Sequence, residues 1–485
     1  MNNKGQITVF LSLILSALLL LGLFAVRICK FYTAKARACM AVDSAISDIK
    51  SEYNSYIFEH YHILLFDKTD YGRGEAAVEE FFGDSVKDNL DYGQNLAYVA
   101  ITDFDLLTDN NCEALKSQIE DYAAYAALDY TGDAIMSKTG GKDAVMDEKI
   151  LEKMDVDINA NNETAENNSP SDGSELTNQG NDPDGDNNKT IKKKEDDPRR
   201  FTKNIGKVGI LFFVAPEDLK ISSDIVDLSE CPSWKLSAGA DFNNLNDSFN
   251  SYSRLKKDLK KNTAWNNSII EAGCGLAYAR EVFNSAVNQD KNEDTVFKFE
   301  LEYLACGKSS DYLNLKKAVN RICVIRFPIN FTYLLSDTAR MTRVKEIAYS
   351  LSFATAVPEP ILKYLIAGCW SYAEALSDVR ILLDGKKCEF KKSNSNWKTD
   401  INHLSSSLKE KQNGEGKGMS YEDYLLILMA LDMDASYRRM LDVMQLNARR
   451  IYPDFKMENA AVGLTVDVSI ESSDSIFDFN ISGGY

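Results

Sequence analysis

The longest apolar stretch of the chain lies near its start, where the twenty residues from Ile7 to Val26 carry no charged side chain. A helix that rises 1.5 Å per residue covers roughly 30 Å over this length, which matches the hydrocarbon core of a bilayer. The pattern predicts a transmembrane anchor. Its apolar side chains are Ile7, Val9, Phe10, Leu11, Leu13, Ile14, Leu15, Leu18, Leu19, Leu20, Leu21, Leu23, Phe24 and Val26.

A cleaved secretory signal is the alternative interpretation of this segment. The apolar cores of such signals usually span about 7–15 residues, and this one is longer. The A-x-A-like sites, Ala34–Ala36 and Ala36–Ala38, also lie beyond the first cations that follow the apolar stretch. These two observations favour a retained anchor.

The helical pattern continues beyond the anchor to about Tyr61, because apolar residues recur there at steps of three and four. We expect one long helix without a break before Asp67, half of it in lipid and half amphipathic. Small side chains allow another helix or a sheet to approach closely. The residues expected to form this helix-packing interface are Phe31, Ala34, Ala38, Ala41, Ala45 and Ile49.

The remaining pattern predicts a helix-rich α+β fold with few strands. Strands are expected where apolar residues alternate or form short runs, at Ala97–Thr108, Val208–Ala215 and Ala461–Glu471. Helices are expected at Cys112–Lys138, Ser268–Ser285, Val296–Cys306, Leu313–Arg326, Ser336–Phe353, Ile361–Leu383 and Tyr421–Arg450. Ser420 and Asp423 predict a helix cap, and Lys386–Lys392 a hairpin with the sequence before Trp397.

The helix at Ile361–Leu383 is apolar enough to raise the question of a second membrane span. Four charged residues within it, Lys363, Glu374, Asp378 and Arg380, would be costly in lipid. We therefore expect this helix to lie in the core of the folded domain.

The segment Asp155–Arg200 contains almost no large apolar residues, so it cannot bury enough surface to offset chain entropy and is expected to be disordered. Within it, Asp182–Asn188 resembles a calcium loop, but Pro183 and a missing glutamate favour a solvated linker. The expected organisation is an anchor (1–27), the amphipathic helix with the first part of an ectodomain (28–150), an acidic, Asn-rich linker (151–204) and the main helical α+β ectodomain (205–485).

The composition bears on three possible features of the protein: nucleic-acid binding, disulfide bonds and a zinc site. The chain has 485 residues and a net charge of −18, which argues against nucleic acid as a partner. The chain has nine cysteines, an odd number, and no C-x-x-C motif, so we expect no disulfide framework. One or two disulfide bonds remain an alternative if the domain is exported. His60 and His62 would point to different faces of a helix, which disfavours a zinc site.

Motifs that would indicate chemistry are weak. Gly414–Gly418 precedes a helix but lacks the phosphate-loop pattern, so a flexible turn is favoured. Asp467–Glu471 starts like the metal site of a von Willebrand-type adhesion domain, but its fifth residue is glutamate, and a strand with outward polar residues is favoured.

Two acidic pairs, Glu300/Glu302 and Asp432/Asp434, are conceivable acid–base pairs. Residues two apart on a helix do not face one another, so solvated faces or helix-end charges are expected instead. We expect no catalytic residues, no cofactor and no metal.

The N-terminal sequence resembles that of a known family. Lys4–Ser12 (KGQITVFLS), the hydrophobic helix, Ala36–Ala38 and Ala41–Ala45 resemble an uncharacterised Gram-positive family of anchored proteins linked to tight-adherence (Tad) pilus loci, with a TadE/TadG-like N-terminus. The resemblance continues through blocks at Glu52–Asn54, Glu302–Leu304 with Gly307–Lys308, Tyr333–Asp337, Asp378–Arg380 with Leu383, and Tyr421–Leu425. True prepilins are cut after a glycine and carry glutamate at the fifth mature position, where cleavage at Gly5 would place Phe10.

The resemblance implies a single-pass cell-membrane protein whose large domain is extracytoplasmic. It would be a minor pseudopilin-like or assembly component of a Tad-type pilus or secretion system without catalytic activity, and its partners would be the membrane and other Tad-like components. The cations after the anchor, Arg27, Lys30, Lys35 and Arg37, favour the opposite topology by the positive-inside rule. A cytoplasm-facing enzyme or sensor and a secreted adhesin therefore stay as alternatives.

Overall fold

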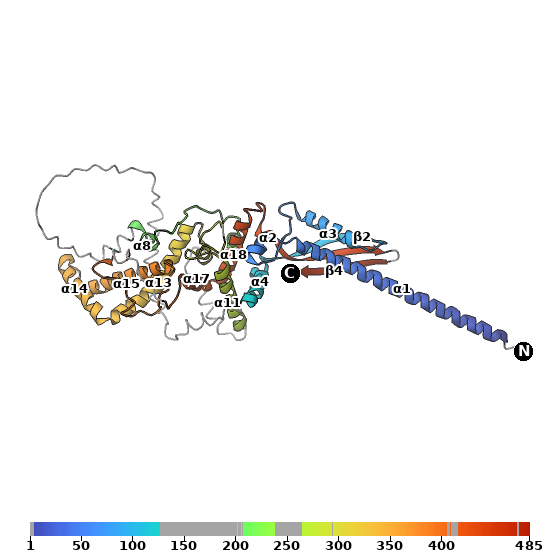
Figure 1. Cartoon of the computed structure of the whole chain (residues 1–485), viewed down its shortest axis with the longest axis horizontal. Helices are drawn as coiled ribbons and strands as arrows, with labels where there is room; N and C mark the ends of the chain where they lie inside the picture. The colour runs from blue at the N-terminus through green and yellow to red at the C-terminus, as the bar shows by residue number, and fades with distance from the viewer. Residues whose placement is uncertain are drawn as a thin grey trace. The chain divides into compact units, whose positions relative to one another are not determined.

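The computed structural model describes residues 4–126, 201, 205, 207–237, 264–292, 294–404, 408, 416–472 and 475–485. Apart from Ala126, the described residues belong to one compact unit, which comprises residues 1–125 and 196–485. Helices dominate this unit among the described residues, and a few strands accompany them, as the sequence predicts (Figure 1). The expected linker at 151–204 lies outside the described residues except for Phe201, and so does the calcium-like loop.

The chain begins with one long helix, α1, which runs from Lys4 to Ser51 (Figure 1). Its first half is apolar and exposed, and among the described helices this is the one long and apolar enough to cross a membrane. The expectation of an unbroken helix to Asp67 is wrong. Helix α1 ends at Ser51, and a second helix, α2, runs from Ser55 to Tyr61. Asn54 caps the start of α2, because its side chain accepts a hydrogen bond from the N–H of Ile57 at 2.9 Å.

Four strands form one antiparallel sheet. Strand β3 (Ala460–Ser472) is central and pairs along one edge with β2 (Gln94–Leu106). Its other edge pairs with β1 (Phe66–Asp67) and then β4 (Ser475–Gly484). The strands expected at Ala97–Thr108 and Ala461–Glu471 are confirmed, whereas β4 was not expected. The sheet therefore joins the beginning of the chain to its end.

One face of this sheet is covered by the second half of α1 and by α3 (Glu75–Asn89), as Figure 1 shows. Alternate β3 residues from Leu464 to Ile470 are buried in this layer, and the residues between them, such as Asp467, are half-buried on the other side. Asp467 accepts a hydrogen bond from Asn480 of β4 at 2.6 Å. The D-x-S segment is therefore a strand with outward polar residues, as expected.

The other described helices build a larger body around a second core. They are α4 (Asp109–Ala126), α8 (Leu211–Val214), α9 (Pro232–Ser237), α11 (Ala264–Val282), α12 (Glu300–Cys306), α13 (Asp311–Ser336), α14 (Thr338–Thr355), α15 (Glu359–Leu383), α17 (Tyr421–Ala430) and α18 (Met433–Ala448), with a short 3-10 turn at Met457–Asn459. Apart from α8 and α9, each overlaps a segment whose pattern predicts helix, and α13 extends ten residues beyond the predicted end at Arg326. Helix α15 is buried over most of its length, so its assignment as a core helix is confirmed.

Three local expectations are wrong. The run expected as a strand at Val208–Ala215 contains the helical turn α8, because a short apolar run is compatible with either buried form. The helix expected over Tyr421–Arg450 is broken where Asp432 caps α18 by accepting from the N–H of Ala435 at 3.2 Å. The capping box of Ser420 and Asp423 at the start of α17 is confirmed.

The third error concerns the hairpin at Lys386–Lys392, where Cys388 pairs instead with Met419 through two backbone hydrogen bonds of 2.8 and 3.0 Å. This pairing explains why residue 418, at the end of the Gly414–Gly418 segment, is a glycine. Gly418 has φ +117°, and a Cβ there would lie 2.2 Å from the carbonyl oxygen of Cys388. Gly418 therefore permits close backbone approach.

Two glycines of α11 give a matched test of the packing between α11 and α18. A Cβ on Gly275 would lie 2.3 Å from the hydroxyl oxygen of Tyr437, whose hydroxyl donates to the carbonyl of Glu271 at 3.0 Å. We expect Gly275→Ala to lower the free energy of unfolding by about 1–3 kcal/mol, because Tyr437 must move. Gly273→Ala, with nothing within 4 Å of its Cβ, should raise it by roughly 0.5–1 kcal/mol. Thermal unfolding of the detergent-solubilised chain measures both, and equal effects would contradict this packing.

Candidate functional site

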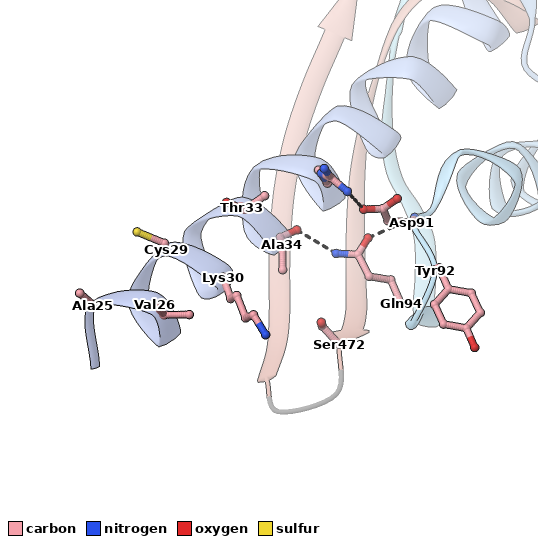
Figure 2. Close-up of a pocket in the computed structure, with 11 residues that line it drawn as sticks. Ala25, Val26, Cys29, Lys30, Thr33, Ala34, Asp91, Tyr92, Gln94 and Ser472 are labelled. Atoms are coloured by element: carbon pink, nitrogen blue, oxygen red, sulfur yellow. Dashed lines mark hydrogen bonds and ion pairs between the residues drawn. The ribbon is translucent and has the colours of Figure 1, made fainter. Parts of the chain in front are cut away.

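A pocket of about 480 Å³ lies beside α1 just after its apolar half (Figure 2). Its walls come from α1, from the turn between α3 and β2, and from the end of β3. The lining residues are Ala25, Val26, Cys29, Lys30, Thr33, Ala34, Arg37, Asp91, Tyr92, Gln94 and Ser472. Apolar side chains from the end of the predicted anchor therefore share one pocket with cationic and hydrogen-bonding groups.

Polar contacts hold the turn between α3 and β2 against α1. The side-chain amide of Gln94 donates to the carbonyl of Ala34 at 2.8 Å, and Arg37 forms an ion pair with Asp91 (Figure 2). Lys30 makes no ion pair with any carboxylate of the described chain. Because Asp91 balances Arg37, the ammonium of Lys30 leaves the pocket with a net positive charge.

The residues expected to form a helix-packing interface lie on this same helix, and the structure shows what covers them. Ala38, Ala45 and Ile49 are buried in one core with the sheet and α3, and Ala41 is buried as well. Ala34 is half-buried at the edge of this layer, and the ring of Phe31 packs edge-on against Phe477 of β4, with 5.3 Å between centroids. The stripe is thus occupied by the chain's own sheet, whereas the residues of the predicted anchor from Val9 to Val26 are exposed.

A second polar cluster lies in the middle of the helical body and is sealed from solvent. Arg326 of α13 donates from Nη2 to Asp378 of α15 at 2.8 Å. Lys392, in the loop after α15, donates to Asp378 at 2.7 Å and to Glu374 at 2.5 Å. The remaining oxygen of Glu374 accepts two hydrogen bonds from Thr399 at 2.8 Å. All four charged residues are at most 5% exposed.

This four-residue network is balanced in charge, with two acids against two cations. Burial would raise the pKa of Asp378, but the charges of Arg326 and Lys392 lower it below its usual value. Burial would likewise lower the pKa of Lys392, and the carboxylates of Asp378 and Glu374 raise it instead. Asp378 and Lys392 therefore both favour their charged forms, and the network ties two helices to a loop. The sequence signal for it is a pair of acids four residues apart in an otherwise apolar helix.

Glu300 and Glu302 lie in the first turn of α12, so the expectation of helix-end charges is confirmed. The alternative of a solvated face is wrong, because both side chains are fully buried. Glu300 accepts from the N–H of Asn284 and from the side chain of Asn447, each at 2.9 Å. Glu302 accepts from the N–H of Ala286 at 2.9 Å. Burial raises the pKa of each carboxyl group to about 7. The helix is buried on all sides, so residues pointing in different directions are all buried.

The nine cysteines are free thiols, and six of them are buried. Among the described residues, no group of three or more His, Cys, Asp or Glu side chains is placed to hold a metal ion. His60 and His62 both lie at the end of α2, where the ring of His62 stacks on Tyr122 with 4.9 Å between centroids.

A model of a family of unknown function, DUF5702, matches residues 188–472, which is more than half of the chain. The chain belongs to this family. No curated protein and no solved structure matches the chain. The DUF5702 match ends at Ser472, so it includes the central strand β3 but not its partners β1, β2 and β4.

The buried network of the DUF5702 region gives a prediction with a neighbouring control. Lys392→Met leaves Glu374 without its cation in the core, and we expect a loss of about 3–5 kcal/mol in the free energy of unfolding. Lys391→Met changes the adjacent, exposed lysine and should shift stability by less than about 0.5 kcal/mol. Thermal unfolding of the two variants compares them, and a mild effect at Lys392 would show that the network contributes little.

The two buried glutamates of the DUF5702 region predict a pH dependence of stability. Their folded pKa values, about 7, lie above the usual value of 4.5, so the folded state binds more protons between these pH values. The free energy of unfolding should therefore fall as the pH rises from 4.5 to 7, by on the order of 3 kcal/mol for each carboxyl group.

Glu302→Gln keeps the oxygen that accepts from Ala286 and should flatten this fall. Glu471→Gln, at an exposed residue, is the control and should leave it unchanged. Unfolding midpoints measured from pH 4 to 8 test this, and identical profiles for both variants would refute the assignment.

Proposed function

We propose that this DUF5702 protein is a single-pass, membrane-anchored protein of the cell envelope. Its large domain is extracytoplasmic, and it serves as a minor pseudopilin-like or assembly component of a Tad-type pilus or secretion system, without catalytic activity. The observation that carries the proposal is the continuity of α1, a single helix with an exposed apolar half and a half packed on the sheet.

A continuous helix supports this role because it fixes how the domain is held. The apolar half needs lipid or an apolar partner, since its side chains stay exposed in the chain itself. The second half has Ala38 and Ala45 completely buried under the sheet, so no flexible stalk separates anchor and domain. A subunit that must be presented in a defined orientation at a membrane needs such a rigid connection.

The position of the A-x-A-like sites supports a retained anchor over a cleaved signal. Both lie inside α1, between Ala34 and Ala38, where the helix packs on the sheet and on the turn at Gln94. Cleavage there would cut through a hydrogen-bonded helix and remove part of the buried stripe. An apolar N-terminal helix is by itself compatible with a signal sequence as well as with an anchor.

Two sequence features bear on the Tad link and on topology, and one structural feature bears on catalysis. The KGQITVFLS opening supports the link. The cations Arg27, Lys30, Lys35 and Arg37 favour a cytoplasmic domain and motivate the alternative of a tethered enzyme or sensor. The perturbed carboxylates Glu300 and Glu302 are sealed from solvent, which supports a non-catalytic role over that alternative.

Topology and anchoring are tested together in cells. Protease treatment of intact cells should remove the domain, and a C-terminal alkaline phosphatase fusion should be active. Leu15→Arg places a charge at the middle of the apolar segment, at a cost of about 2.5–3.5 kcal/mol, and should release or destabilise the chain. Leu15→Ile is the matched control and should stay in the membrane fraction.

Protection from protease would indicate that the domain is cytoplasmic. Recovery of the wild-type chain from the aqueous phase without detergent would refute the anchor. The Tad role is tested by purifying the tagged chain in mild detergent and identifying its partners. Recovery of pilus or secretion-platform subunits is the expected result. Their absence from a cross-linked sample would count against it.

A further inference from the structure

The lining of the pocket beside α1 changes in character along the helix. Val26, Lys30, Thr33 and Arg37 follow at steps of four, three and four, so they lie on one face. The first is the last residue of the apolar segment, and the others carry an ammonium, a hydroxyl and a guanidinium. A ligand that fills the pocket therefore meets apolar carbon at one end and cationic donors at the other.

The helix geometry sets the depth of this pocket in a bilayer. Lys30 lies one turn beyond Val26, which is about 6 Å. The headgroup layer extends roughly 5–7 Å beyond the hydrocarbon core. Side chains of a helix lean toward its N-terminus, so the Lys30 ammonium leans toward the membrane and reaches the level of the lipid phosphates.

An exposed aromatic residue supports the same placement. Tyr92 is fully exposed on the turn between α3 and β2, on the far side of Gln94 from α1 (Figure 2). Tyr32 of α1 is also 65% exposed. Tyrosine is enriched at membrane–water interfaces, where its ring sits among the headgroups while its hydroxyl stays hydrated. Tyr32 follows Lys30 by two residues, which is about 3 Å along the axis of α1.

We propose that this pocket binds the headgroup of one anionic phospholipid, with the phosphodiester held by Lys30 and Thr33 and the acyl chains lying against Ala25 and Val26. The inference rests on the proposed role of α1 as a membrane anchor. It does not depend on which side of the membrane carries the domain, because each leaflet presents its phosphates at the same depth from the hydrocarbon core.

A lipid fits this pocket better than a free phosphate does. Ala25 and Val26 belong to the exposed apolar surface of α1, so the lower wall of the pocket is continuous with the lipid-facing side of the helix. Free phosphate would leave that wall uncovered. Arg37 is engaged by Asp91, so the free charge is the single Lys30, which suits the one negative charge of a phosphodiester.

The test counts lipids bound to the full-length chain. The chain is purified in detergent, phosphatidylglycerol or phosphatidylcholine is added, and native mass spectrometry measures the fraction that carries one lipid. We expect phosphatidylglycerol to bind more tightly than phosphatidylcholine. Lys30→Gln should weaken phosphatidylglycerol binding about fivefold, since one cation near a membrane surface contributes about that factor. Lys30→Arg should restore it.

Lys35→Gln is the matched control, because Lys35 is an exposed cation of the same helix that does not line the pocket. It should leave binding within twofold of the wild type. Equal binding of the two lipids, or equal effects at Lys30 and Lys35, would overturn the proposal. Displacement of phosphatidylglycerol by inorganic phosphate at equal concentration would overturn the lipid assignment as well.

The assay also separates this proposal from the anchor. It uses detergent-solubilised chain, so it reports on the pocket alone. If the wild-type chain proves to be soluble without detergent, the anchor fails, whereas loss of lipid selectivity with intact membrane partitioning refutes only the pocket.

Discussion

The close packing of α1 on the sheet is the contact on which the rest of the architecture depends. Ala38 and Ala45 have no exposed surface, and small side chains there let the helix approach the strands closely. Gly483 of β4 shows how tight this approach is, because a Cβ there would lie 2.6 Å from Cγ2 of Ile46. The same helix carries the exposed apolar segment, so one continuous helix connects that segment to the sheet.

The sheet also joins parts of the chain that are far apart in sequence. Strand β3 lies inside the DUF5702 match, but its partners β1, β2 and β4 lie outside it. A second connection links α2 to the helical body, where the side chain of Asn447 donates to the hydroxyl of Tyr61 at 2.7 Å and to Glu300 at 2.9 Å. The N-terminal segment thus completes the core of the DUF5702 region.

Buried charge serves two different purposes in this body. Arg326 and Lys392 form ion pairs with Asp378 and Glu374, and this network ties α13 to α15 and to the following loop. Glu300 and Glu302 lie in the same core without such close cations, and burial raises their pKa values to about 7. In the network the cations lower the pKa of Asp378 and the carboxylates raise that of Lys392, whereas Glu300 and Glu302 titrate near neutral pH.

The sequence by itself determined the elements whose signal is local. The apolar helix, the alternating strand β3, the core helix α15 and the Ser420 cap follow from period, charge content and capping chemistry within a few residues. The end of α1 at Ser51 was missed because the cap at Asn54 interrupts an otherwise continuous apolar pattern.

Only the tertiary structure decided which residues meet. The pocket unites Lys30, Tyr92 and Ser472, which come from three distant segments, and no spacing in the sequence relates them. Likewise, Glu300 and Glu302 look like a solvated pair because charge predicts exposure, yet α12 is surrounded by other helices. Side-chain pattern fixes the local period of the backbone, whereas burial and proximity depend on how distant segments pack, and that packing creates both the pocket and the buried carboxylates.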